Sequence, residues 1–164
     1  MKNRNLLITA AAIFAFLTIL SSVLIAHSMY LYFRAFDITN TFEVELSNIA
    51  INDVAGSLYV SIDVTVRVYN PTEWELKYTS IWVKLYLNKR DKFLGESHYY
   101  IELFRAPKMP PYSNITKTIR ISNVHRMSIP SGPNLWIAEI IVWVYGIPLL
   151  EEGASFERIR TYVG

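Results

Sequence analysis

Residues 58–72 read LYVSIDVTVRVYNPT, a run in which aliphatic side chains occupy every second position until the chain reaches Asn-Pro. The residues between them are mostly polar. A period of two with one apolar face is typical of a strand whose sheet is buried on one side. The sequence therefore predicts a strand here and a second sheet packed over its aliphatic face. The aliphatic positions are Leu58, Val60, Ile62, Val64, Val66 and Val68.

The end of this strand is set by Asn70 and Pro71. Proline has no backbone N–H and holds the residue before it in an extended conformation, so a sheet ladder stops there. The Asn70 side chain can hydrogen-bond to nearby backbone and close the turn. We interpret the pair as a strand terminator, because it supplies no nucleophile, base or ligand.

Similar segments recur along the rest of the chain, separated by residues typical of turns. About seven strands at this spacing are typical of a sandwich, and no long helical period follows the N-terminal segment. The predicted fold class is therefore all-β, a two-sheet antiparallel β-sandwich. The strand segments are 42–46, 58–68, 81–87, 99–103, 115–121, 135–145 and 156–163, and the turn segments are 52–56, 70–71, 88–91, 107–113, 130–134 and 148–153.

The N-terminal segment differs from everything after it, because residues 5–33 contain no charged side chain. Residues 6–26 alone would form a helix of about 31 Å, enough to cross a hydrocarbon layer of about 30 Å. His27 and an aromatic group would then lie at the level of the lipid headgroups. We expect one transmembrane helix within residues 1–34, embedded through residues 6–33, and one β-sandwich domain over residues 35–164. The aromatic group is Tyr30, Tyr32 and Phe33.

The charges around this segment predict its orientation. Lys2 and Arg4 precede it, whereas Arg34 and Asp37 follow it. The positive-inside bias then places the N-terminus in the cytoplasm and the domain outside a cell membrane that the chain crosses once, as a signal-anchor. The alternative is a signal peptide cleaved at Ala26-His27-Ser28. The apolar stretch is about twice as long as a signal-peptide core, which favours a retained anchor.

Beyond the anchor the chain is nearly neutral. Three of its 16 Lys and Arg flank the apolar segment, which leaves 13 cations against 14 Asp and Glu. A nucleic-acid-binding protein has a basic face, and the one basic cluster, residues 89–92, is interrupted by an acid and fits a solvated hairpin tip. We therefore expect no nucleic-acid partner.

The sequence carries no recognisable catalytic or metal-binding motif. It has no cysteine, and its three histidines, His27, His98 and His125, lie far apart without a metal-ligand spacing. Glu43 and Glu45 fit a solvated strand face, and no serine or glycine lies in a nucleophile-elbow or phosphate-loop pattern. We expect no enzymatic activity, no cofactor, no metal and no small-molecule substrate.

The order of elements from residue 58 to 122 resembles the group-2 late-embryogenesis-abundant (LEA-2) domain, also called the water-stress and hypersensitive-response domain. The similarity is carried by a strand that ends in Asn-Pro, a tyrosine downstream, a strand with spaced apolar residues, a Leu-Gly pair and a proline-rich loop, and it extends over roughly residues 40–163. The matching residues are Asn70, Pro71, Tyr78, Val83, Leu85, Tyr86, Asn88, Leu94, Gly95, Pro110, Pro111 and Ser113.

The resemblance implies a small sandwich related to the fibronectin type III and immunoglobulin-like kinds, without catalysis and linked to desiccation and stress tolerance. Some LEA-2 members carry one N-terminal membrane span. Residues 122–134 depart from the pattern, because they are too short and proline-rich for the helix that some members have there.

Two further features are candidates for contact or modification. Residues 135–145 are apolar on both faces, which fits either a strand covered on both sides or a partner surface around Trp136, Ile140 and Trp143. Asn114 begins an Asn-Ile-Thr glycosylation sequon, which we place in a loop on the outer side.

We therefore expect a non-catalytic, membrane-anchored binding or protective domain that is displayed on the outer side of the membrane and related to stress or desiccation. The alternative is an accessory anchor subunit of a cell-envelope or filament assembly. Either function allows a protein partner or a homo-oligomer.

Overall fold

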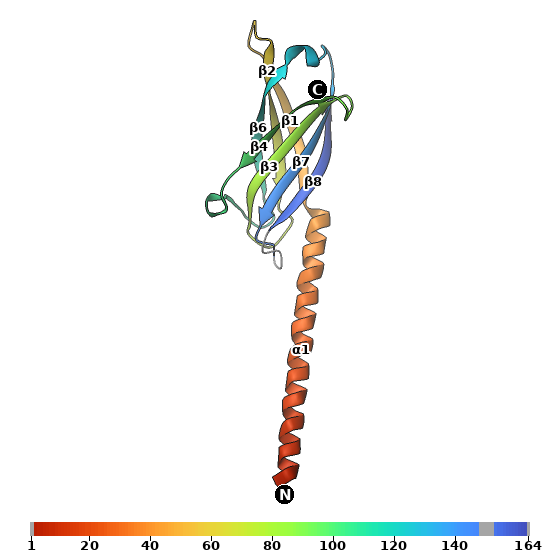
Figure 1. Cartoon of the computed structure of the whole chain (residues 1–164), viewed down its shortest axis with the longest axis vertical. Helices are drawn as coiled ribbons and strands as arrows, with labels where there is room; N and C mark the ends of the chain where they lie inside the picture. The colour runs from red at the N-terminus through yellow and green to blue at the C-terminus, as the bar shows by residue number, and fades with distance from the viewer. Residues whose placement is uncertain (1, 148–152, 164) are drawn as a thin grey trace.

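A computed structural model describes residues 2–147 and 153–163 of the chain. A single long helix, α1 (Lys2–Thr41), projects from one end of a β-sheet body (Figure 1). The strands are β1 (Glu43–Asn52), β2 (Tyr59–Tyr69), β3 (Leu76–Leu87), β4 (Phe93–Tyr100), β5 (Lys108–Met109), β6 (Asn114–His125), β7 (Leu135–Tyr145) and β8 (Ala154–Val163), with 3₁₀ turns η1 (Leu103–Arg105) and η2 (Arg126–Ser128).

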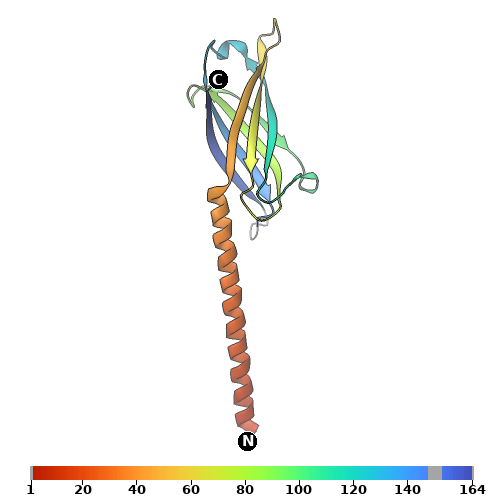
Figure 2. The same ribbon diagram turned by 180° about the vertical axis from the view of Figure 1, so that it is seen from behind.

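The strands form two antiparallel sheets that pack face to face. The smaller sheet has the order β1-β2-β6, and the larger has the order β4-β3-β7-β8 with β5 added beside the start of β3. Figure 2 shows the smaller sheet in front of the larger one. The predicted all-β, two-sheet sandwich with one N-terminal apolar helix is confirmed.

The predicted strand of residues 58–68 forms β2 almost as expected. Val60, Ile62, Val64, Val66 and Val68 are buried in the core, so its aliphatic face points at the second sheet. Leu58 precedes the strand and is exposed. The basic cluster of residues 89–92 lies in the turn between β3 and β4, as predicted.

The predicted strand of residues 99–103 was wrong in its extent. Strand β4 begins at Phe93 and ends at Tyr100, and Leu103 belongs to η1. The reason is that β4 pairs with β3 through the tight 88–92 turn, which sets its register from Phe93 onward. Part of the predicted 148–153 turn, residues 148–152, lies outside the described residues.

The outer faces of the two sheets differ in chemistry. The smaller sheet carries charged and hydroxyl groups, among them a bidentate ion pair in which the Arg120 guanidinium donates to Asp63 at 2.7 and 3.0 Å. That hydrogen bond lowers the pKa of the Asp63 carboxyl below its usual range. The larger sheet carries aromatic and aliphatic side chains around one half-buried pair, Lys84 and Glu139, at 2.8 Å. These side chains are Trp82, Tyr86, Ile137, Ile141 and Trp143.

Arginines of β8 cover the open edge of β1. The Arg160 side chain donates to the Val44 carbonyl at 2.6 Å, and the Arg158 side chain donates to the Phe42 carbonyl at 3.3 Å. An exposed strand edge is a template for pairing with another chain, and charged side chains on it discourage such pairing. Strand addition is therefore disfavoured at the start of this edge.

Helix α1 is continuous with the core of the sandwich. It runs past Arg34, where the predicted membrane segment stops, to Thr41. Ala35, Ile38 and Phe42 are buried among core residues, and the Phe42 ring stacks on Phe156 with centroids 4.1 Å apart. The helix therefore enters the domain without a flexible spacer.

Candidate functional site: the cleft between the helix and the sandwich

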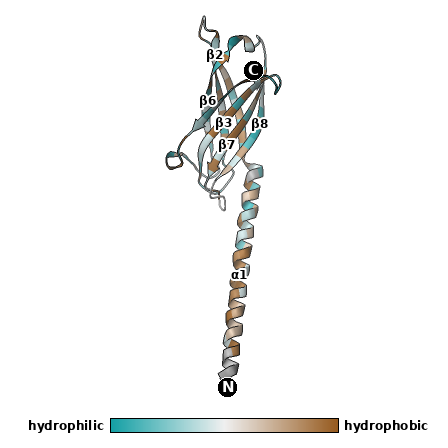
Figure 3. Cartoon of the chain, viewed as in Figure 1, coloured by the Kyte–Doolittle hydropathy of each residue, from teal (hydrophilic) through white to brown (hydrophobic). Residues whose placement is uncertain are grey.

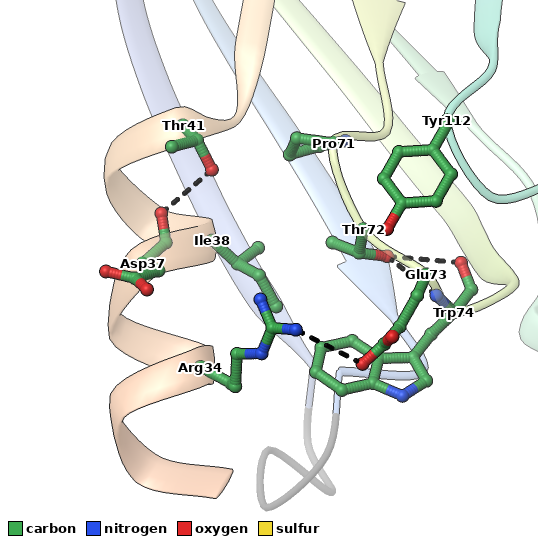
Figure 4. Close-up of a pocket in the computed structure, with 9 residues that line it drawn as sticks. All are labelled: Arg34, Asp37, Ile38, Thr41, Pro71, Thr72, Glu73, Trp74 and Tyr112. Carbon is green, nitrogen blue, oxygen red and sulfur yellow. Dashed lines mark hydrogen bonds and ion pairs between the residues drawn. The ribbon is translucent and has the colours of Figure 1, made fainter. Parts of the chain in front are cut away.

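A cleft of about 440 Å³ separates the last turns of α1 from the loop that follows β2 (Figure 4). It lies at the end of the sandwich from which the helix projects, which we call the base. One wall is the helix, and the other is the 71–74 loop together with Tyr112 from the loop before β6. The lining residues are Arg34, Asp37, Ile38, Thr41, Pro71, Thr72, Glu73, Trp74 and Tyr112.

The loop wall is held in place by the side chain of Asn70, which is fully buried. Its amide nitrogen donates to the carbonyls of Trp74 at 2.9 Å, Met109 at 3.2 Å and Pro110 at 2.9 Å. Its amide oxygen accepts from the Thr72 backbone N–H at 3.0 Å and the Thr72 hydroxyl at 2.7 Å. The prediction that Asn70 closes the turn through backbone contacts is confirmed, and Asn70 also joins the 71–74 loop to residues 109–110.

Thr72 and Tyr112 complete this wall. The backbone N–H of Trp74 donates to the Thr72 hydroxyl at 3.1 Å, and the backbone N–H of Tyr112 donates to the Thr72 carbonyl at 3.2 Å. Tyr112 has a φ of +51°, a left-handed conformation that costs a residue with a side chain about 1–2 kcal/mol. Tyr112 keeps this conformation in the folded protein, and the residue is 63% exposed at the cleft.

The helix wall contributes charge. A terminal nitrogen of Arg34 lies 3.7 Å from a Glu73 carboxylate oxygen, so the pair crosses the cleft, and both side chains are about half exposed. The Arg34 Nε also donates to the Tyr30 hydroxyl at 3.2 Å, one turn earlier on the helix. The Asp37 carboxylate points away from the loop (Figure 4). The cleft thus presents one cation and one anion face to face, beside the rings of Trp74 and Tyr112.

Two other residues of the predicted family motif, Tyr78 and Gly95, lie away from the cleft and act in packing. Tyr78 is buried near the Tyr99 ring, and burial raises the pKa of its hydroxyl. Gly95 lies within β4 beside a register shift. A Cβ at Gly95 would approach the Ile121 side chain to 2.8 Å, so the position fits glycine because two sheets meet there closely.

Asn114 is the first residue of β6, opposite Tyr69, and its side chain is exposed. It therefore lies in a strand and not in the predicted loop, because β6 pairs with β2 right up to that residue. Its glycosylation stays a prediction.

The three residues of the predicted partner surface on residues 135–145 do not lie on one face of β7. Trp136 and Ile140 point into the core and are 3% and 0% exposed, whereas Trp143 points outward and is 40% exposed. The physical reason is the period of two, since residues 136 and 140 share one face of β7 and residue 143 lies on the other. Trp136 and Ile140 are unavailable to a partner.

The sequence did not predict a functional role for four of the residues that line the cleft: Arg34, Glu73, Trp74 and Tyr112. Arg34 was assigned only to the flank of the membrane segment, and Trp74 was passed over within the turn after Pro71. Within residues 2–147 and 153–163, no group of three or more His, Asp or Glu side chains lies close enough to hold a metal ion.

Comparison with known proteins shows similarity in fold only. No family model matches this chain, and no curated protein matches its sequence. The solution structure of the Arabidopsis thaliana protein AT1g01470 superposes with a TM-score of 0.57 at 11% identity, covering 74% of this chain and 80% of that one. A LEA-like protein, At2g46140.1, has a TM-score of 0.45 at 13% identity and covers 90% of this chain and 83% of its own. The two-sheet fold is therefore shared with a solved plant protein.

Proposed function

We propose that this protein is a membrane-anchored, non-catalytic contact domain of the LEA-2 kind, displayed on the outer surface of a cell membrane. Its role would be to hold a rigid sandwich at that surface and to meet partners or protect the envelope under water stress. This role would require no chemical reaction, because it would depend only on non-covalent contact with partners or with the envelope.

The observation that carries this proposal is the apolar surface of α1. Within the stretch from Leu7 to Ile38, the most apolar window has a mean hydropathy of 2.4, and it is not covered by any described part of the protein. Figure 3 shows this apolar band on the helix outside the β-sheet body. Fully exposed apolar side chains over such a length are stable in lipid and not in water.

The LEA-2 assignment rests on the resemblance of the sequence to that family. The residues that resemble the family include Asn70 and Pro71, which build the strand terminator described above. The two-sheet fold also recurs in the AT1g01470 structure. A stress-related role follows from the resemblance alone.

A second candidate function is an accessory subunit of an envelope or filament assembly. The aromatic outer face of the larger sheet favours it, because Trp143, Phe93 and Tyr100 are 40%, 52% and 65% exposed there. Aromatic residues are enriched at protein interfaces. Reproducible co-purification with larger subunits from detergent extracts would favour this candidate, whereas a protein that migrates alone would favour the first.

Cysteine labelling tests the anchor and its orientation, since the chain has no cysteine of its own. Ser131→Cys introduces a thiol at the end of the sandwich farthest from the helix, and Asn3→Cys introduces one near the N-terminus. On intact cells a membrane-impermeant maleimide should label Ser131→Cys, and it should label Asn3→Cys only after permeabilisation.

The reverse labelling pattern would contradict the orientation. Release of the protein by alkaline carbonate without detergent would contradict the anchor. An intact mass that lacks the first 28 residues would show a cleaved signal peptide instead.

A further inference from the structure

The apolar surface of α1 is longer than a bilayer core and reaches the sandwich itself. From Leu7 to Phe36, the last exposed apolar residue on the helix, α1 is about 45 Å long, against about 30 Å of hydrocarbon and about 40–45 Å with both headgroup layers. Tyr32, Phe33 and Phe36 are 65%, 59% and 57% exposed on its last turns. Burying them in the interface draws the base of the sandwich down to the headgroups.

The cleft lies at that same level. Arg34 falls between Phe33 and Phe36 in sequence, and its contact with Glu73 places the 71–74 loop beside this turn of the helix. Trp74 and Tyr112, which flank the pair, are the residue types that gather at membrane interfaces. The lining of the cleft is thus suited to the region between hydrocarbon and water.

The charges of the cleft complement a zwitterion. Arg34 and Glu73 face each other at 3.7 Å, a long separation for an ion pair, and both side chains are about half exposed. The attraction between them is therefore weak, and a ligand can insert between the two charges. A phosphate would be bound by the guanidinium of Arg34. An adjacent ammonium would be bound by the Glu73 carboxylate and by the faces of the Trp74 and Tyr112 rings. A volume of about 440 Å³ lies within the usual range for small-molecule sites.

We infer that this cleft receives the zwitterionic headgroup of a phospholipid, phosphate toward Arg34 and ammonium toward Glu73, in the leaflet on which the sandwich rests. The inference rests on the proposed membrane anchor and adds a specific lipid contact to it. The domain is then held to the bilayer at two places, by the span of α1 and by the loops at its base.

Tryptophan quenching in vesicles tests this contact. The full chain is reconstituted in phosphatidylcholine vesicles that contain a small fraction of phosphatidylcholine with a nitroxide on its headgroup. Trp74 should be the tryptophan that this lipid quenches, so Trp74→Phe should abolish most of the quenching. Trp82→Phe removes a tryptophan from the middle of the outer sheet face and should leave the quenching unchanged.

Charge variants test recognition by the cleft. Glu73→Gln removes the proposed ammonium ligand and should reduce the quenching of Trp74. Glu75→Gln is the matched control, because Glu75 pairs with Lys108 at 2.8 Å outside the cleft. Tyr112→Ala should weaken quenching in the same way as Glu73→Gln, whereas Tyr59→Ala, which removes an exposed tyrosine at the far end, should not.

Three results would overturn the inference. If the protein floats with the vesicles but Trp74 is not quenched, the anchor stands and the headgroup contact is wrong. If Trp74 is quenched equally in Glu73→Gln and Glu75→Gln, the cleft does not recognise the headgroup. If free phosphocholine at submillimolar concentration removes the quenching, the ligand is soluble and not a lipid. Failure of the protein to float with vesicles would instead refute the proposed anchor together with the inference.

Discussion

The two ends of the sandwich are built differently. The base, where the helix enters, comprises residues 70–75, 101–113, 146–147 and 153, and the opposite end, the tip, comprises the turns at residues 53–58, 88–92 and 126–134 (Figure 1). Each end contains one buried asparagine, Asn70 at the base and Asn134 at the tip. The Asn70 side chain has five hydrogen bonds to two segments, the 71–74 loop and residues 109–110, whereas the Asn134 side chain donates two, to Pro130 at 3.1 Å and Gly132 at 2.9 Å. The buried asparagine therefore fixes the backbone through more hydrogen bonds at the base, where the helix meets the domain, than at the tip.

The largest difference between the ends should appear when each asparagine is replaced. Asn70→Ala removes five hydrogen bonds made by a fully buried side chain, and should lower the free energy of unfolding by about 3–5 kcal/mol. Asn134→Ala should lower it by about 1 kcal/mol, because water can reach the exposed residues Pro130 and Gly132. Urea unfolding of the full chain in detergent, followed by near-ultraviolet circular dichroism, measures both. Equal losses would remove the contrast between base and tip.

A pair of glycines should give the next largest contrast. Gly146 at the base and Gly56 at the tip have φ of +98° and +82°, so alanine is strained at both. A Cβ at Gly146 would lie 2.9 Å from the Glu75 carbonyl oxygen, whereas at Gly56 nothing lies within 4 Å. Gly146→Ala should cost about 2–4 kcal/mol and Gly56→Ala about 1 kcal/mol in the same unfolding measurement. The contrast fails if Gly56→Ala is the more destabilising.

The exposed ion pairs should give the smallest effect. Arg34→Gln breaks the 3.7 Å pair with Glu73 at the base, and Arg126→Gln breaks a 2.8 Å pair with Asp53 at the tip. Exposed ion pairs contribute little to stability, so neither change should measurably alter the urea midpoint. A large loss in Arg34→Gln would show that charge, and not the packing of Ala35, Ile38 and Phe42 in the core, holds the helix against the sandwich.

Much of the fold could be predicted from alternation and turn residues. The aliphatic face of β2, the end of that strand at Asn70 and the two-sheet fold follow from local patterns. The continuation of α1 to Thr41 could not be read in this way, because Arg34 and Asp37 resemble the flank of a membrane segment. They are in fact helical, with Ala35 and Ile38 between and beside them turned into the core.

The candidate site was beyond sequence reasoning for a different reason. The cleft brings Arg34, Glu73 and Tyr112 together from three segments that are distant in the sequence. The local periodicity of apolar residues does not predict contacts of this kind. The prediction of the partner surface, by contrast, was wrong although the sequence contained the information to correct it. Trp143 is an odd number of residues from both Trp136 and Ile140. In a strand such residues lie on opposite faces.

The unbroken passage of α1 into the core has a mechanical consequence. A disordered tether would let the sandwich tumble and sample many heights above the lipid. Here the rod and the body turn together, because Ala35, Ile38 and Phe42 are packed inside the domain. With α1 in a bilayer as proposed, the tip would stand at a constant reach from the lipid and would tilt only when the rod tilts.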